Sequence, residues 1–488
     1  MFFPLFALVF IATLTAGLRG GASRAVAIGW VGAAFLLPFW LQVGVGSMFL
    51  DLRSGAVAAV LVITLTNPPA GIFRLTFADA LIGGVILVQV VTQFQTGTLR
   101  PLSVPEVCRK WLGPYLMGRL LITKPSDLRI AVGGLSRIIA GLSVYAVIEA
   151  FTKVNVINKV LGRTFDLLEE GEGYRWGLKR SHATFDHPIY FGMALVLLLP
   201  WAMEAARLAR QGVGEKWWRR LPWMIAAALF ATVSRGPQIA GMATATIYLF
   251  CRIPRIRVPM LLIGLVGGVG GYIVKEQLVD GLAMMAGEKG GDAAPTYIQI
   301  EGEEVEYTGT NHRVLLFRVY DEAIQKAGAF GYGPDLHGIE LEESIAQRFG
   351  SIDCHYLLFY LQNGYLGLGG FLILTLGILL NLGRVAFRRN LPQSALAAGL
   401  FGSLLAVAVL LMSVWFSADF GGIWLFSAGV AGRLPLLVVE APADSPTTAA
   451  TTTTPPTQPP APTPAHAPVR PQAPVIKYVR QLTPVARR

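Results

Sequence analysis

The chain has 488 residues, of which 53% are hydrophobic and only 15% are charged. A soluble domain carries about 25% charged residues, so this composition excludes an ordinary soluble protein and indicates a polytopic membrane protein. The net charge is +11, but the surplus lies in short loops and in the C-terminal tail, where membrane topology accounts for it. We therefore expect no nucleic-acid partner, and membrane lipids as the surroundings.

A helix that spans a bilayer needs about twenty mostly apolar residues. Stretches of this kind follow one another along the chain and predict an all-α polytopic membrane protein with about 12 transmembrane helices. The third stretch ends at Asn67-Pro68-Pro69 and is expected to be short or broken. The predicted helices cover residues 3–18, 25–49, 56–72, 76–95, 130–151, 187–204, 221–235, 237–251, 258–275, 355–381, 394–416 and 419–438.

Loop charge predicts how these helices are oriented. Four basic segments fall on one side of the predicted bundle, which the positive-inside rule makes cytoplasmic. They are residues 96–129, 205–220, 252–257 and 383–390. The large loop 276–354 holds fifteen acidic against five basic residues, is expected to contain helices, and is placed on the opposite side. Arg19 and Arg24 would also face that opposite side, which conflicts with the rule.

The C-terminal part differs from the rest in composition. Residues 441–488 are rich in proline, threonine and alanine, a composition that cannot bury a core. We expect this segment to be a disordered, basic tail on the cytoplasmic side, partly in the polyproline II conformation. The chain therefore divides into a transmembrane domain, residues 1–440, and this tail.

The residues that suggest chemistry lie on the side opposite the basic loops. His355 stands where the acidic loop meets an apolar run, and a histidine exchanges protons near neutral pH. Arg180 and Arg235 lie near predicted helix ends on the same side, and Arg313 lies in the loop. Because a charge at the bilayer centre costs roughly 2.5–3.5 kcal/mol, several cations gathered at one membrane face favour an anionic ligand. A single interfacial arginine is equally typical of a snorkelling anchor.

The neighbours of these residues refine the prediction. Arg180 precedes a helix start marked by Pro188, and the exposed amides of a helix start bind anions. Arg313 and Arg318 belong to an amphipathic pattern that also fits a plain surface helix. The chain has no GxxxxGK[ST] motif and no compact cluster of Asp, Glu and His. We therefore expect no nucleotide, metal or other cofactor.

These segments together resemble the O-antigen ligase and O-antigen polymerase superfamily of bacterial inner-membrane glycan transferases. The likeness covers residues 175–375. Arg180, Thr184-Phe185 and Pro188 resemble the family's Arg-x-x-Gly-Thr-Phe-x-x-Pro segment, although Ala183 replaces the glycine. The turn 234–236 matches its Ser-Arg-Gly sequence.

The second half of the likeness lies in and after the acidic loop. Arg313 and the Gly-Tyr-Gly sequence at 331–333 resemble the arginine and Gly-x-Gly of the family's large periplasmic loop. His355, followed by Gly-Tyr-Leu-Gly at 364–367, resembles its His-Asn…Gly-x-x-Gly signature. Tyr356 stands where the family has asparagine, and a phenol cannot copy the donor and acceptor pair of an amide.

The resemblance implies a multi-pass glycosyltransferase of the lipid-linked-donor, GT-C-like type in the bacterial inner membrane, with its active site facing the periplasm. Such an enzyme is metal-independent and transfers a glycan from undecaprenyl pyrophosphate to a sugar hydroxyl of a glycan or lipid A-core acceptor. It implies that His355 is the general base and that the reaction inverts the anomeric centre. Arg180, Arg235 and Arg313 are then expected to bind the donor pyrophosphate. His187, Arg318 and Tyr356 are the expected supporting residues.

Two alternatives stay open. Within the family, no residue distinguishes ligation onto lipid A core from polymerisation of O-antigen or exopolysaccharide repeat units. Outside it, the chain could be a membrane solute transporter or channel, which typically has inverted repeats and broken helices at the bilayer midplane. We find no internal repeat in the sequence, and the charges of interest lie at one predicted interface.

Overall fold

The computed structural model describes residues 2–46, 48–69, 71–72, 74–162, 173–273, 296–300, 303–307 and 312–437. Within these ranges the protein is mostly helical, with three short two-stranded antiparallel hairpins. Among the described residues, five stretches are long and apolar enough to cross a membrane. They are Phe2–Leu36, Phe77–Gln95, Asp127–Thr152, Pro188–Arg210 and His355–Ala386. A helical protein of the membrane is therefore confirmed, while the predicted tail, 441–488, lies outside the described residues.

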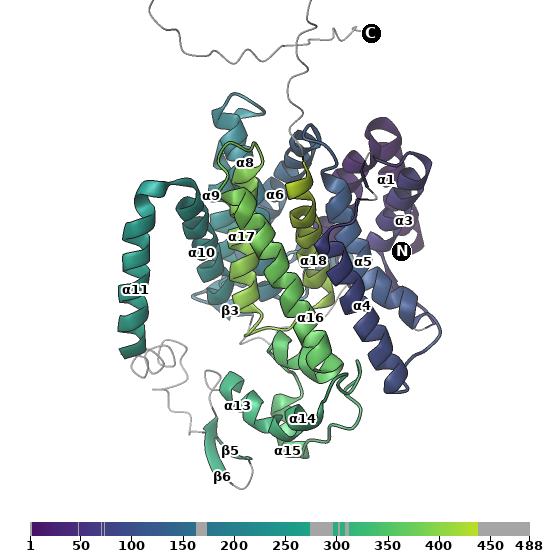
Figure 1. Ribbon diagram of the computed structural model, residues 1–488, viewed down its shortest axis with the longest axis vertical. Coiled ribbons are helices and arrows are strands. Elements are labelled where there is room, and N and C mark those ends of the chain that lie inside the picture. Colours follow the sequence, from purple (N-terminus) through teal and green to yellow (C-terminus); the bar gives the residue numbers. More distant parts are fainter. Residues whose placement is uncertain are drawn as a thin grey trace, which may run out of the picture. The chain divides into compact units, whose positions relative to one another are not determined.

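Figure 1 labels most of the elements of the chain. The first half contains α1 (Phe2–Ala25), a π-helical turn (Val26–Trp30), α2 (Val31–Leu36), β1 (Gln42–Val45), β2 (Met48–Asp51), α3 (Leu52–Thr66), α4 (Phe77–Gln95), α5 (Ser103–Leu121), α6 (Asp127–Thr152), α7 (Val156–Val160), β3 (Tyr174–Arg175) and β4 (Leu178–Lys179). The second half contains α8 (Pro188–Arg210), a 3-10 turn (Lys216–Arg220), α9 (Leu221–Ala231), α10 (Arg235–Arg252), α11 (Arg257–Ile273), β5 (Thr296–Ile300), β6 (Glu303–Tyr307), α13 (His312–Val319), α14 (Asp321–Lys326), α15 (Glu343–Phe349), α16 (His355–Ala386), α17 (Ser394–Leu410) and α18 (Ala418–Arg433).

Most predicted helices are present, but the prediction for residues 25–49 is wrong beyond Leu36. Residues 42–51 form the hairpin β1–β2, with Gln42 opposite Asp51 and Val45 opposite Met48. Gly46 has a φ of 61°, a backbone conformation that glycine adopts without strain and that favours a tight turn. The hairpin leads directly into α3, whose first turn is capped by the Asp51 side chain.

The largest difference from the sequence prediction is α5, because residues 96–129 were expected to form a basic loop. Instead Ser103–Leu121 is a helix that packs closely against α18. At the crossing, a Cβ added to Gly118 would lie 1.9 Å from the carbonyl oxygen of Phe426. A Cβ added to Gly429 would lie 2.0 Å from that of Tyr115. Glycines on both helices thus let the two backbones approach, as in small-residue packing of membrane helices.

The end of α5 lies beside the turn that separates the two parts of α1. α1 turns at Gly20 and Gly21, where the backbone is not helical. Beside this turn, the Ser23 hydroxyl donates a hydrogen bond to the carbonyl of Leu121, 2.6 Å away, at the last residue of α5. The turn, with Arg19 and Arg24 on either side of Ser23, therefore lies at the end of the bundle where α5 finishes.

α16 is interrupted at Gly364, and the acidic loop fills the break. Gly364 has φ 63° and ψ −168°, which only glycine adopts readily. The amides of Tyr332 and Gly333 donate to the carbonyls of Leu361 and Gln362, at 2.8 and 3.0 Å. In return, the amides of residues 365 and 366 donate to the carbonyls of residues 328 and 329. The helix groups freed by the break are therefore satisfied by the loop.

Two hydrophobic cores follow from this arrangement. The larger joins buried residues of the helical bundle and includes Trp30, Trp201 and Trp424. The smaller joins the loop helices to the first turns of α16, through Leu316, Phe349 and other residues. In Figure 1, α13, α14 and α15 gather at the start of α16. The prediction that the acidic loop contains helices is confirmed, and the hairpin β5–β6 was not foreseen.

Candidate functional site

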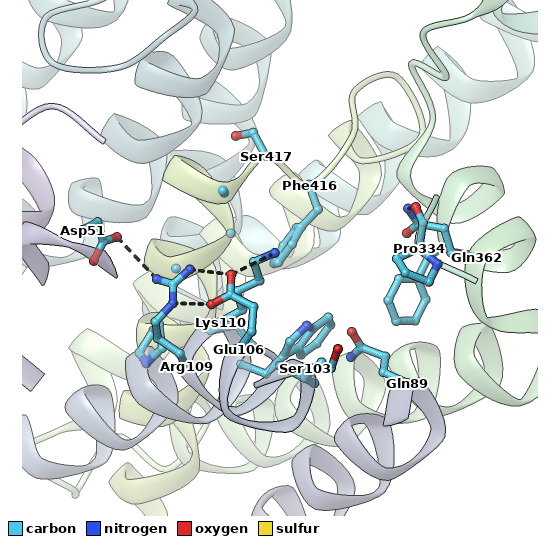
Figure 2. A pocket seen from close by; sticks show the side chains of 18 of the residues that line it. Asp51, Gln89, Ser103, Glu106, Arg109, Lys110, Pro334, Gln362, Phe416 and Ser417 are labelled. Atoms are coloured by element: carbon cyan, nitrogen blue, oxygen red, sulfur yellow. Dashed lines mark hydrogen bonds and ion pairs between the residues drawn. The ribbon is translucent and has the colours of Figure 1, made fainter. Parts of the chain in front are cut away.

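A cavity of about 490 Å³ opens beside His355. Its walls come from the starts of α3, α5, α16 and α18, the end of α4, and residues 334–335 of the acidic loop. Figure 2 shows Pro334 and Gln362 facing the charged side chains of α5 across this cavity. Its volume falls in the range of roughly 300–1,000 Å³ that is usual for small-molecule sites.

His355 is buried, with 3% of its surface exposed, and it lines this cavity. The backbone amide of His355 donates to the carbonyls of Leu411 and Val414 at 2.9 and 3.0 Å, which fixes the start of α16. The Phe416 ring stacks on the imidazole with centroids 4.8 Å apart. Within the described part of the chain, neither ring nitrogen has a hydrogen-bond partner. A buried polar group without a partner calls for an explanation, and a ligand in the cavity supplies one.

The wall opposite His355 carries a network of charges. Asp51 accepts hydrogen bonds from Ser54 and from Arg53 Nε, the latter at 2.8 Å. Burial alone would raise the pKa of Asp51, but Arg53 and Arg109 outweigh it and hold that pKa below its ordinary value. Asp51 is therefore ionised at neutral pH. Arg109 lies 3.7 Å from Asp51 and donates to Glu106 at 2.7 and 2.8 Å. Figure 2 draws the links of Arg109 to Asp51 and Glu106.

The remaining lining combines side-chain amides with aromatic rings. Gln89 and Gln93 reach it from α4, and Gln362 reaches it from α16. Gln362 donates to the carbonyl of Pro334 at 3.0 Å, so the loop edge is tied to the helix. Trp111 stacks on Phe416 with centroids 6.0 Å apart, which continues the aromatic wall away from His355. Apolar walls with a few placed polar groups are the usual composition of a ligand site.

Arg180 belongs to a second cluster. Its side chain is buried, and Nη2 donates to the Ser234 hydroxyl at 3.2 Å, so the two arginine motifs, at 180 and at 234–236, do meet. The segment after Arg180 is held by Glu149, which is fully buried at the end of α6. Glu149 accepts from the hydroxyl of Ser181 at 2.7 Å and from the amide of Ala183 at 2.9 Å.

Two other predicted residues lie beside this cluster. Arg235 is the first residue of α10, directly after Ser234. His187 caps the start of α8, where its Nδ1 accepts from the amide of Ile189 at 3.1 Å. Burial, together with the nearby charges of Arg180, His182 and Arg175, lowers the pKa of His187 to about 4. His187 is therefore neutral at physiological pH, which suits a capping acceptor better than a cationic ligand for phosphate.

The three remaining predicted residues lie elsewhere. Arg313 is exposed on α13. Arg318 forms an ion pair with Glu303 of β6. The Tyr356 hydroxyl donates to the carbonyl of Ala408 at 2.6 Å, so this side chain faces α17. In these positions Arg318 and Tyr356 have structural partners within the fold.

The Arg180 cluster and the His355 cavity lie at the same end of the bundle but on two sides of the segment 411–420. Phe416 of that segment stacks on His355, while Trp415 contacts Tyr190 of α8, next to His187. Among the described residues, the lining of the His355 cavity does not include Arg180, Arg235 or Arg313. Of the four residues expected to bind substrate or to catalyse, only His355 therefore lines this cavity.

Sequence reasoning missed the charged wall of the cavity. The sequence prediction assigned its charged residues to loops or to no site at all. These residues are Arg53, Arg109, Lys110, Asp51 and Glu106. One signal was available: residues 96–129 are too many for an ordinary connection, since loops between helices have roughly two to eight residues. No three histidine, cysteine, aspartate or glutamate side chains of the described ranges gather closely enough to hold a metal ion.

Comparison with known proteins adds no further assignment. A scan against protein-family models finds no match to this chain, and a search of curated proteins finds none either. The likeness to the O-antigen ligase and polymerase superfamily therefore rests on the motif residues alone and stays a prediction.

Proposed function

We propose that this protein transfers a glycan from a polyprenyl-pyrophosphate lipid to a sugar hydroxyl, with His355 as the general base. The observation that carries the proposal is the imidazole itself, since both ring nitrogens lack a partner among the described residues while the ring lines a cavity of ligand size. A base for a sugar hydroxyl must be neutral and within hydrogen-bond reach of the proton it takes. Desolvation by the aromatic rings around His355 favours the neutral form.

The reaction places two demands on the protein. His355 takes the proton of the acceptor hydroxyl, the oxygen attacks the anomeric carbon, and the bond from that carbon to the pyrophosphate breaks. The pyrophosphate leaves with the electron pair and therefore needs cations, for which the forked guanidinium groups of Arg180 and Arg235 are suited. Attack from the side opposite the leaving group inverts the anomeric centre.

The position of the two clusters supports a shared reaction. Phe416 stacks on His355, and the neighbouring Trp415, which lines the same cavity, contacts Tyr190 beside His187. A donor held by Arg180 and Arg235 and an acceptor held beside His355 would therefore meet along this aromatic segment.

A groove next to His355 suits the lipid part of the donor. It has a volume of about 420 Å³ between α16 and α17, and its lining is almost wholly apolar. The lining residues are Tyr356, Leu368, Leu372, Ala408, Val409 and Met412. The one polar group there, the Tyr356 hydroxyl, is bound to the carbonyl of Ala408. A polyprenyl chain could therefore lie in this groove without burying an unsatisfied polar atom.

Positive charge at the end of the bundle away from His355 supports a periplasmic active site. Of the helices that begin at the end of the bundle that holds His355 and Arg180, five carry arginine in their last turn, whereas α3 does not. These five helices are α5, α8, α10, α16 and α18. The positive-inside rule makes that arginine-rich end cytoplasmic. Residues 365–386, which follow the break at Gly364, are long enough to span a bilayer by themselves, and we take His355 to lie at the periplasmic end of this span.

The test is a transfer assay with purified full-length protein and a lipid-linked glycan donor. His355→Ala should lower transfer by roughly 10²–10⁴-fold, the usual contribution of a general base, while membrane insertion is unchanged. His337→Gln is the matched control, because His337 is an exposed histidine that does not line the cavity. Transfer at the wild-type rate by His355→Ala contradicts the assignment. Solute flux through liposomes, with no transfer in any assay, would instead establish a transporter.

A further inference from the structure

The inner part of the cavity holds more positive than negative charge. Three cations, Arg53, Arg109 and Lys110, share two carboxylates, Asp51 and Glu106. The rim pair of Arg100 and Asp335, 4.0 Å apart, is neutral as a whole. The lining therefore carries a surplus of one positive charge beside His355. This surplus lies at the end of the bundle away from the arginine-rich helix ends, where the positive-inside rule predicts few cations.

Among the three inner cations, Lys110 has the N–H donors that are least engaged by the neighbouring carboxylates. Its ammonium group lies 3.2 Å from Glu106 Oε1, an oxygen that already accepts from Arg109 Nη2. An ammonium group has three N–H donors, and about half of this side chain is exposed. Arg53 and Arg109 are less exposed and more fully engaged with Asp51 and Glu106. A ligand that enters the cavity therefore meets Lys110 as the available positive charge of its inner part, behind the exposed Arg100 at the rim.

The size of the surplus decides which anion fits. A carboxylate carries one negative charge and neutralises the lining, whereas a pyrophosphate carries more charge than one lysine can offset in a partly buried site. The amides of Gln93 and Gln362 and the indole of Trp111 line the same cavity. Side-chain amides pair with hydroxyl groups, so the cavity offers polar partners to a sugar.

We propose that this cavity binds a uronic acid residue of the acceptor glycan, with Lys110 pairing with its carboxylate and the side-chain amides of the lining facing its hydroxyl groups. The identity of the acceptor rests on the proposed function, while uronate binding itself does not. The bound sugar lies in the cavity that His355 lines, so one of its hydroxyl groups can reach the imidazole. The donor pyrophosphate is left to the Arg180 cluster.

Binding tests the proposal without catalysis. Full-length protein in lipid nanodiscs is titrated calorimetrically with glucuronate- and galacturonate-containing disaccharides and with the matched neutral disaccharides, in which a CH₂OH group replaces the carboxylate. The wild-type protein should bind a uronate about ten- to hundred-fold more tightly than its neutral partner, the range that a hydrogen bond to a charged group gives. Lys110→Gln should abolish the difference, and Lys110→Arg should keep most of it.

Lys326→Gln is the matched control, because Lys326 pairs with Glu322 at the same i,i+4 spacing as Lys110 with Glu106, but away from the cavity. It should bind uronates like the wild type. Equal binding of acidic and neutral sugars by the wild type, or no binding of either, overturns the proposal. So does a Lys110→Gln protein that loses affinity for inorganic pyrophosphate and not for uronate. Transfer to neutral acceptors alone would leave the proposed function intact and reject this inference.

Discussion

The two polar clusters at the His355 end of the bundle differ in how their charges are held. Around Arg180, a fully buried carboxylate, Glu149, fixes the backbone and side chains of the next residues through short hydrogen bonds. Around His355, charged groups face a cavity, and the imidazole has no partner within the described ranges. The first cluster is pre-organised by the protein alone, whereas the second leaves the imidazole and charged side chains facing a cavity. Substitutions should therefore affect stability in the first and binding in the second.

The largest effect on stability is expected when the buried carboxylate of Glu149 is removed. Glu149→Ala leaves the donors of Ser181, Ala183 and Asn155 without their acceptor. A buried unsatisfied donor costs about 1–3 kcal/mol, so the free energy of unfolding should fall by roughly 4 kcal/mol. Thermal unfolding of the purified protein measures the loss. Glu149→Gln keeps one acceptor oxygen and should lose less; an unchanged melting temperature in Glu149→Ala would contradict the structural role.

A second substitution tests whether the loop and α16 form one unit. A Cβ at Gly364 would lie 2.2 Å from the carbonyl carbon of Ala329 and would force a φ of 63° on a non-glycine residue. Gly364→Ala should therefore destabilise the protein by about 3 kcal/mol and expose the loop to protease. Gly369→Ala is the control in the same helix, because a Cβ there meets nothing within 4 Å. Equal stability of the two variants would show that the loop does not depend on the break.

Arg180→Lys separates the donor cluster from the cavity. A lysine keeps the charge but loses the forked donor that reaches Ser234 and phosphate oxygens. We expect transfer to fall about 100-fold, in line with loss of a charged hydrogen bond of roughly 3 kcal/mol, while uronate binding stays the same. Steady-state kinetics with each substrate varied in turn measures the effect. An altered uronate affinity at an unaltered transfer rate would reverse the assignment of the two clusters.

The smallest expected effect concerns pH. The pKa of His187 is about 4 in the folded protein and about 6.5 when exposed, so the unfolded chain binds more protons between these values. The stability that neutral His187 gives is present above pH 6.5 and is lost as the pH falls towards 4. The loss should reach about 2 kcal/mol by pH 5. Melting temperatures at pH 7.5, 6 and 5 measure it, and His187→Gln should flatten the profile; an equal slope in both proteins would contradict it.

Much of the fold could be predicted because apolar runs specify helices locally. α4 was expected at 76–95 and α10 at 237–251, close to their observed bounds. α5 could not be recognised by hydrophobicity, because its charged residues find their partners only in the fold, as Arg119 does with Asp79 of α4. Because α5 is a helix and not a loop, the expected positions of its charged residues were wrong. Arg109 and Lys110 were expected in a basic loop, but they line the His355 cavity.

The candidate site, like the fold, could be predicted only in part. The motif residues were found because each lies beside a local signal, such as Pro188 at a helix start or the Ser-Arg-Gly turn. The meeting of the Gly-Tyr-Gly loop sequence with the break in α16 follows from backbone hydrogen bonds between distant residues. Sequence spacing does not encode such contacts. The charged wall likewise depends on Asp51 from a hairpin and Glu106 from a helix far along the chain.

The polar character of α5 has a consequence for how the protein is made. Glu106, Arg109, Lys110 and Arg119 each disfavour entry of this helix into lipid, by roughly 2.5–3.5 kcal/mol for a charge at the helix centre. The helix that packs against it through matched glycines, α18, is the last α-helix of the described part of the chain and is synthesised long after α5. We therefore expect the translocon to release α5 without stable insertion, and the helix to enter the membrane only when α18 arrives. Ribosome-bound chains that stop before α18 should leave α5 accessible to aqueous labelling reagents.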